Sequence, residues 1–84
     1  MPDLQLKLTY EQLGSQEAVL VEWRKQIGDW VRKNEELAIC ETDGRQISFK
    51  APAQGALQKI AVAAGQTFRV GEILGIIRTV MGGT

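Results

Sequence analysis

The segment Leu37-Ala38-Ile39-Cys40-Glu41-Thr42-Asp43-Gly44-Arg45-Gln46-Ile47-Ser48-Phe49 predicts a tight β-hairpin. Two runs rich in apolar and β-branched residues flank Asp43-Gly44, a pair that is typical of two-residue hairpin turns. Glycine adopts a positive φ without a Cβ clash, as a type I′ turn requires. This turn places apolar side chains opposite each other. The predicted partners are Thr42 with Arg45, Cys40 with Ile47, and Ala38 with Phe49.

Outside this hairpin the chain consists of further short segments rich in β-branched and aromatic residues. Turn-forming residues separate them, and no clean stretch of helical periodicity lies between. Many short strands with frequent turn signals are typical of an all-β sandwich or barrel. The remaining predicted strands span 4–10, 19–23, 57–62 and 73–80, with the arms of the hairpin at 37–42 and 45–49.

An internal repeat relates two parts of the chain by 37 residues. When residues 28–39 are laid on 65–76, five of the twelve pairs are identical. A unit that occurs twice suggests two similar halves around one core, because a solenoid needs at least three units. The loop that begins Gly14-Ser15 has no counterpart of equal length in the second half, where Pro52 lies in a tighter turn. This loop is either a recognition element or a neutral surface loop.

Composition excludes several classes of function. The 84 residues predict one domain over 1–84, with a core at about 4–78 and a flexible tail at 79–84. The absence of His excludes a His base or metal ligand, and one Cys cannot form a disulfide within the chain or a Cys-rich zinc site. We therefore expect no metal, no catalytic site and a cytoplasmic location. The zero net charge and the lack of a long apolar run predict neither nucleic-acid nor membrane binding.

Several short motifs, in order, resemble those of the biotinyl/lipoyl attachment domain. They are Val21-Glu22-Trp23, Gly28-Asp29-x-Val31, Glu41-Thr42-Asp43, Ala51-Pro52-x-x-Gly55, Gly65 and Val70-Gly71. The pattern is most similar to the lipoyl domains of 2-oxo acid dehydrogenase acyltransferases. The resemblance implies a flattened β-barrel, or barrel-sandwich hybrid, of two four-stranded sheets with quasi-twofold symmetry. It also implies a lipoate or biotin carried covalently by a lysine at the hairpin tip, as a swinging arm.

The chain departs from this family at the attachment point. The tip of lipoyl domains reads Glu-Thr-Asp-Lys-Ala, and Gly44 stands here at the position of the lysine. Amide formation needs a primary amine, which Gly44 lacks and which the protonated guanidinium of Arg45 does not replace. No lysine lies between Lys33 and Lys50. We therefore expect no lipoate or biotin at the tip.

Three functions remain open on the sequence. The first is a non-enzymatic pseudo-carrier or interaction module whose protein partners include components of a 2-oxo acid dehydrogenase-type complex. The second is the lipoyl carrier domain of an acyltransferase in which Lys has been replaced by Gly44. The third is a structural domain of a larger enzyme or adaptor protein.

The candidate interaction residues lie at the hairpin tip, in the unmatched loop and at one tryptophan. Arg45 is either a partner contact or a solvated turn residue. Trp30 is either an exposed interface anchor or packs against a neighbouring loop, whereas Trp23 and Cys40 are predicted to pack inside. The complete set is Glu41, Thr42, Asp43, Arg45, Gly14, Ser15 and Trp30.

Overall fold

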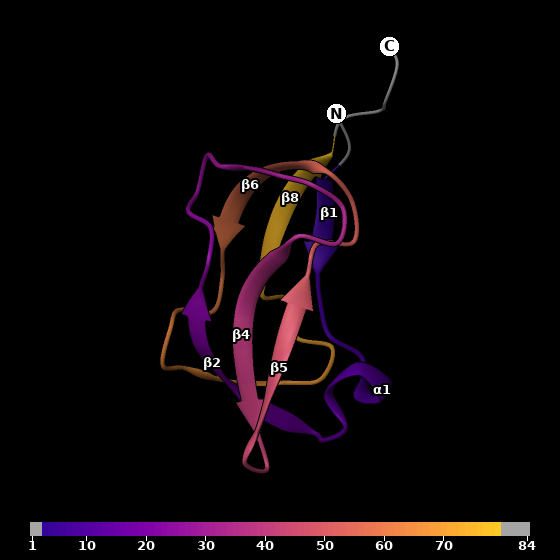
Figure 1. Cartoon of the computed structure of the whole chain (residues 1–84), viewed down its shortest axis with the longest axis vertical. Helices are drawn as coiled ribbons and strands as arrows, with labels where there is room; N and C mark the ends of the chain where they lie inside the picture. The colour runs from indigo at the N-terminus through magenta and orange to yellow at the C-terminus, as the bar shows by residue number, and fades with distance from the viewer. Residues whose placement is uncertain (1–2, 80–84) are drawn as a thin grey trace.

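The computed structural model describes residues 3–79 as a small barrel of eight strands with one short helix (Figure 1). No helix among these residues is long and apolar enough to cross a membrane. In chain order the elements are β1 (Asp3–Leu6), α1 (Tyr10–Leu13), β2 (Glu17–Trp23), β3 (Trp30–Val31), β4 (Glu36–Thr42), β5 (Arg45–Lys50), β6 (Gly55–Ile60), β7 (Thr67–Arg69) and β8 (Gly75–Thr79).

The strands form two four-stranded antiparallel sheets, in the orders β1-β8-β6-β3 and β5-β4-β2-β7. This confirms the predicted all-β fold of two four-stranded sheets. Figure 1 shows the turn between β4 and β5 at one end of the barrel, and the start of β1 and the end of β8 at the other. The hairpin tip is therefore the most distant point of the fold from the ends of the described chain.

The predicted hairpin forms in the predicted register. Thr42 pairs with Arg45, and the two other predicted pairs are also present. Asp43 has φ = 50° and Gly44 has φ = 74°, so both turn residues have the positive φ of a type I′ turn. The alternation of apolar residues and the turn chemistry specify the same register, which is why the sequence was sufficient here.

The sequence repeat appears as a quasi-twofold relation between the halves. The backbone N–H of Gly28 donates to the carbonyl of Leu57 at 2.8 Å, and that of Gly65 donates to the carbonyl of Leu20 at 2.7 Å. Both glycines have a positive φ, 96° and 90°. The two hydrogen bonds exchange the halves, because Leu57 lies 37 residues after Leu20, as Gly65 does after Gly28.

The core consists of matched residues from the two halves. Leu20, Leu57 and Val31 are completely buried, and Phe68, the repeat partner of Val31, is 1% exposed. Trp23 packs against this cluster, and its indole Nε1–H donates to the carbonyl of Val62 at 2.8 Å. Its predicted packing role is confirmed. Burial of apolar side chains from both halves makes the two sheets one cooperative unit.

Several details of the predicted strands are wrong, including the strand predicted over 57–62, which spans Gly55–Ile60. The chain leaves β1 at Leu6 and forms α1, because Thr9 and Gln12 build a capping box that favours a helical turn over continued strand. The strand predicted over 73–80 begins at Gly75 and reaches Thr79, which the sequence had assigned to the tail. The rest of that tail, 80–84, lies outside the described residues. The short strands β3 and β7 were also missed, because two or three residues give no periodicity.

Candidate functional site at the hairpin tip

The tip of the β4–β5 hairpin exposes Asp43 and Gly44 to solvent. A Cβ added at Gly44 would meet no atom within 4 Å, so the space above this residue is open. The turn therefore presents a carboxylate and bare backbone, and neither of its two residues carries an amine. A covalently attached lipoate or biotin does not fit these two residues.

Thr42 lies inside the structure, at the base of the tip. Its side chain is only 6% exposed, and its hydroxyl donates to the backbone carbonyl of Glu17 at 2.9 Å. This hydrogen bond ties the end of β4 to the start of β2. Among the predicted site residues, Thr42 thus supports the tip, while its neighbours Glu41 and Asp43 present their carboxylates on the surface.

Arg45 joins the tip to the loop that the second half lacks. Its guanidinium Nη2 donates to the carbonyl of Leu13, the last residue of α1, at 3.3 Å. Gly14 caps this helix with φ = 74°, and a Cβ on it would lie 2.9 Å from the same Nη2. Arg45 therefore packs on the helix end and is not a purely solvated turn residue. Ser15 follows this cap and is half-buried.

The connection that contains the unmatched Gly14-Ser15 loop is longer by six residues than its counterpart in the second half. Residues 7–16 connect β1 to β2, whereas 51–54 connect β5 to β6. The extra length forms α1, which Figure 1 shows beside the lower part of the barrel, at the same end as the hairpin tip. The contact between Arg45 and the carbonyl of Leu13 was not predicted. The sequence signal that could have found α1, and with it this contact, is the spacing of Thr9 and Gln12, which is that of a capping box at a helix start.

A shallow hollow of about 270 Å³ lies next to the tip, on the outer face of β2, β4 and β7. Its apolar lining is Val19, which is 37% exposed, and the buried Ala18. The carboxylates of Glu17, Glu41 and Asp43 surround it, and we found no arginine or lysine among its lining residues in the described structure. The hollow is therefore acidic with a small apolar centre, which suits a basic side chain of a partner.

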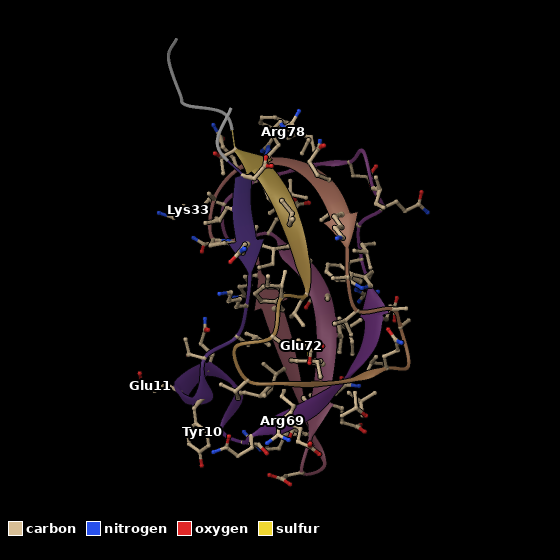
Figure 2. All side chains as sticks on the ribbon, turned by 180° about the vertical axis from the view of Figure 1, so that it is seen from behind. Tyr10, Glu11, Lys33, Arg69, Glu72 and Arg78 are labelled. Carbon is tan, nitrogen blue, oxygen red and sulfur yellow. The ribbon has the colours of Figure 1, made fainter. Side chains whose placement is uncertain are left out.

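Trp30 lies away from the tip. It is 49% exposed on β3 and pairs with Ala56, which pairs in turn with Arg78 near the end of β8. Figure 2 shows Arg78 at one end of the barrel and Tyr10 and Arg69 at the other, where the tip lies. The structure thus brings Gly14, Ser15, Glu41, Asp43 and Arg45 together and leaves Trp30 as a separate exposed residue.

The lysines nearest to the tip in sequence lie toward the far end of the barrel. Lys50 ends β5, five residues after Arg45. It pairs with Glu36, the first residue of β4. At about 3.3 Å per residue this places Lys50 roughly 17 Å along the strand from the tip. Figure 2 shows Lys33 nearer to Arg78 than to Tyr10 and Arg69.

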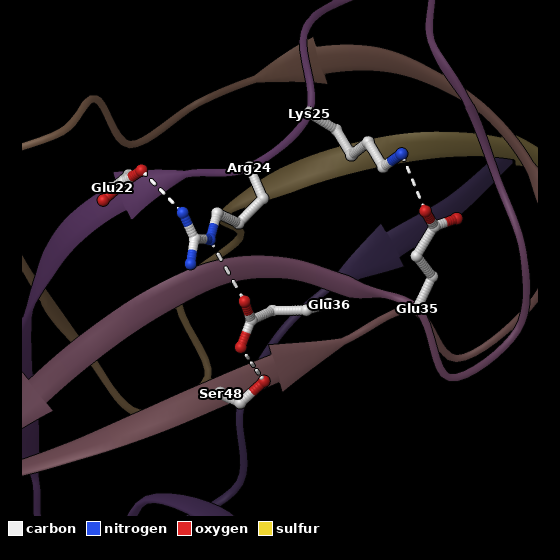
Figure 3. Close-up of polar contacts among 6 residues, drawn as sticks. All are labelled: Glu22, Arg24, Lys25, Glu35, Glu36 and Ser48. Carbon is white, nitrogen blue, oxygen red and sulfur yellow. Dashed lines mark hydrogen bonds and ion pairs between the residues drawn. The ribbon is translucent and has the colours of Figure 1, made fainter.

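A charge network covers the outer face of the other end of the same sheet (Figure 3). Arg24 contacts Glu22 and Glu36 at 3.1 Å each, and the hydroxyl of Ser48 donates to Glu36 at 2.6 Å. The hydrogen bond from Ser48, followed by that from Arg24, lowers the pKa of Glu36. Because all its carboxylates are partnered, this network serves to hold strands together and is not a site with a free acid or base.

A second ion pair in Figure 3 joins Lys25 and Glu35 at 2.7 Å. The hydrogen bond from Lys25, followed by one from the backbone of Arg32, lowers the pKa of Glu35. Cys40 is completely buried, and burial raises the pKa of its thiol to about 11, so the thiolate is not populated at neutral pH. Among the described residues, no group of three His, Cys, Asp or Glu could hold a metal ion.

Comparison with known proteins gives a consistent match over most of the chain. The biotin/lipoyl family, described as "Biotin-requiring enzyme", matches residues 8–77. The succinyltransferase component of the 2-oxoglutarate dehydrogenase complex of Bacillus subtilis is 39% identical over 61 residues, 73% of this chain and 15% of that protein. The corresponding Rickettsia typhi component is 33% identical over 79 residues, 92% of this chain and 20% of that protein. The chain thus spans a fifth or less of the length of these relatives.

Two solved structures are similar over nearly the whole chain. The lipoyl domain of the 2-oxoglutarate dehydrogenase complex from Azotobacter vinelandii has a TM-score of 0.69 and 26% identity, covering 93% of this chain and 96% of that domain. The urea carboxylase of Kluyveromyces lactis has a TM-score of 0.78 over 93% of this chain and 6% of the enzyme. At 17% identity, the second likeness shows the fold alone.

Proposed function

The chain belongs to the biotin/lipoyl family, and on this premise we propose that it is a lipoyl-type domain that docks to proteins without carrying lipoate or biotin. The observation on which this rests is the hairpin tip, where Gly44 stands at the family's attachment position and no amine is present. In this proposal the domain has no catalytic activity of its own. Its cytoplasmic location stays a prediction.

The loss of the amine is not compensated by a neighbouring residue. Arg45 is held against the carbonyl of Leu13, and its guanidinium stays protonated, so it is neither free nor nucleophilic. Lys50 lies roughly 17 Å along β5 from the turn, at about 3.3 Å per residue. An enzyme that recognises a lysine at an exposed hairpin tip would find none in reach.

The surface around the tip is nevertheless well ordered for recognition. The buried Thr42 fixes the hairpin to β2, and Arg45 fixes it to α1. This holds Asp43 and Glu41 in defined positions beside the acidic hollow. The relatives are components of 2-oxoglutarate and pyruvate dehydrogenase complexes, and we propose partners from a complex of that type. Such partners would dock on the tip through basic side chains.

Mass spectrometry after expression with a lipoate–protein ligase, and separately with a biotin–protein ligase, tests the absence of the cofactor. The wild-type chain should keep its unmodified mass, and Gly44→Lys should gain a lipoyl or biotinyl group at residue 44. Gly44→Gln is the matched control, because it adds a long side chain at the same positive φ without an amine. A lipoyl or biotinyl group mapped to any lysine of the wild type contradicts the proposal.

Binding to a purified 2-oxo acid dehydrogenase component from the organism that encodes this chain tests the docking role. Asp43→Lys should weaken this binding, while Lys59→Glu, on β6 of the other sheet, should leave it unchanged. Equal binding of both variants and the wild type, or no binding of the wild type, would show that the tip is not the docking surface.

A further inference from the structure

We propose that the seam between β1 and β5 is a second docking site, which takes an extended acidic segment of a partner protein as an added strand. The seam holds a groove of about 690 Å³, lined by residues within 4–8 and 47–52 together with Gln12 and Asn34. This groove, called the seam groove below, involves neither Asp43 nor Gly44, so it does not depend on whether the tip carries a cofactor.

Both strands that border the seam groove are edge strands. In the sheet orders β1 has β8 as its one neighbour, and β5 has β4. Alternate residues of an edge strand direct peptide N–H and C=O groups away from that neighbour, and these groups can pair with a further strand. With six residues, β5 offers an edge about 20 Å long. A partner segment of five or six residues would match this length.

The floor of the seam groove is apolar. Leu8 and Phe49 are buried there, and Leu4 and Ile47 are half-buried between the two sheet edges. Side chains of an added strand alternate between the two faces of a sheet. Every second side chain of the occupant would therefore lie on this floor, where apolar residues gain the most from leaving water.

The rim of the seam groove is polar and positively charged. Gln5, Lys7, Ser48 and Lys50 are exposed along it, and the groove lining in the described structure includes no Asp or Glu. The side chains of the occupant that point to this rim would be acidic, since opposite charges favour association and like charges oppose it.

The two rim lysines form no ion pair within the described structure. The four ion pairs among the described residues involve neither Lys7 nor Lys50. The carboxylate of Glu36, which is paired in register with Lys50, accepts hydrogen bonds from Ser48 at 2.6 Å and from Arg24 at 3.1 Å. The charge of Lys50 also lowers the pKa of Glu36, but Lys50 forms no ion pair with it, so both ammonium groups remain able to bind acids from outside.

The quasi-twofold relation places one lysine at each end of the seam groove. The pairing of Gln5 with Ile76 repeats that of Ser48 with Ile39, so β1 corresponds to β5 and Lys7 to Lys50. Figure 1 shows β1 and β5 running in opposite directions. Because each lysine lies at the carboxyl end of its strand, the two lie at opposite ends. The occupant should therefore be acidic near both ends and apolar between.

An NMR titration of the ¹⁵N-labelled full chain with the capped peptide Glu-Val-Thr-Val-Glu-Val tests this proposal. Two matched peptides serve as controls: Lys-Val-Thr-Val-Lys-Val reverses the charge, and Glu-Glu-Thr-Val-Val-Val keeps the composition without the alternation. We expect only the first peptide, at up to millimolar concentration, to shift amides of both β1 and β5. Lys7→Glu and Lys50→Glu should each weaken its binding about fivefold, while Lys59→Glu, on the outer face of β6, should leave it unchanged.

Three results would overturn the proposal. One is the absence of amide shifts on β1 and β5 with the alternating acidic peptide at millimolar concentration. Another is equal binding of the three peptides, which would mean that neither charge nor strand geometry is recognised. The third is a concentration-dependent dimer in sedimentation that Lys50→Glu abolishes, since a second copy of the chain would then be the occupant. Preserved amide spectra of the variants exclude unfolding as the cause of any loss.

Discussion

Replacing Gly44 by alanine measures how much of the hairpin turn depends on glycine. Gly44 has φ = 74°, and a Cβ there meets no atom within 4 Å. The whole cost of Gly44→Ala is therefore the cost of a left-handed backbone, which is about 1–2 kcal/mol for an L-residue. Gly44→Asn should cost less, because asparagine visits this region more readily.

The expected loss leaves the domain folded. For 84 residues the total free energy of unfolding is about 4–13 kcal/mol. In a domain of this size, each 1 kcal/mol lost at the midpoint lowers the melting temperature by about 4–8 °C. Gly44→Lys carries the same backbone strain as Gly44→Ala, so a failure of the lysine variant to accept lipoate could not be explained by unfolding.

Urea unfolding followed by the fluorescence of Trp23, which packs against the core, measures these changes. Gln54→Ala, in the exposed turn between β5 and β6, is the control and should change the free energy of unfolding by less than about 0.5 kcal/mol. If Gly44→Ala costs no more than this control, or if Gly44→Asn costs as much as Gly44→Ala, then the turn does not depend on a positive φ and our reasoning is wrong.

Four further predictions test the supporting structure. Thr42→Val should cost about 1–2 kcal/mol in urea unfolding by removing a hydrogen bond at nearly constant volume. The exposed Thr67→Val is its control, and equal effects would contradict this role. Gly75→Ala should cost more than about 2 kcal/mol, since its Cβ would clash with the backbone carbonyl of Lys59 on β6. A neutral effect would show that the β6–β8 pair adjusts easily. The pKa of Glu36 is lowered in the folded state, so its ionised carboxylate stabilises the fold at a pH above its unfolded pKa, and this stabilisation is lost as the pH falls through the folded pKa. Glu36→Gln should therefore flatten the loss of stability between about pH 5 and pH 3. An unchanged stability profile would refute this. With its pKa raised to about 11 by burial, Cys40 should react with a thiol reagent at neutral pH only when urea unfolds the chain; rapid labelling of the native protein would contradict this.

The hairpin, its register and the two similar halves could be predicted because each depends on local chemistry. Asp43-Gly44 selects the turn, and the alternation on both sides selects the register. The repeated glycines at 28 and 65 mark equivalent turns, and the structure gives them the same positive φ and the same type of hydrogen bond. These signals lie within a few residues of the features that they specify.

The candidate site was predicted less completely, because its geometry depends on contacts between distant residues. Thr42 was a candidate for interaction, and only its hydrogen bond to Glu17, 25 residues away, shows that it supports the tip from inside. Arg45 reaches Leu13 across 32 residues. Nothing in the spacing of the sequence shows which of these side chains turn inward.

By itself, the sequence determined that this chain forms an all-β domain with a two-residue hairpin and that this hairpin has glycine at its tip. The tertiary structure alone decided that α1 packs beside the tip, that Trp30 lies far from it, and that the edges of β1 and β5 meet in a groove with a lysine at each end. The physical reason is the range of the forces involved. Turn preference and side-chain alternation act between neighbours along the chain, whereas a groove or a docked loop exists only after burial of the core has brought distant strands together.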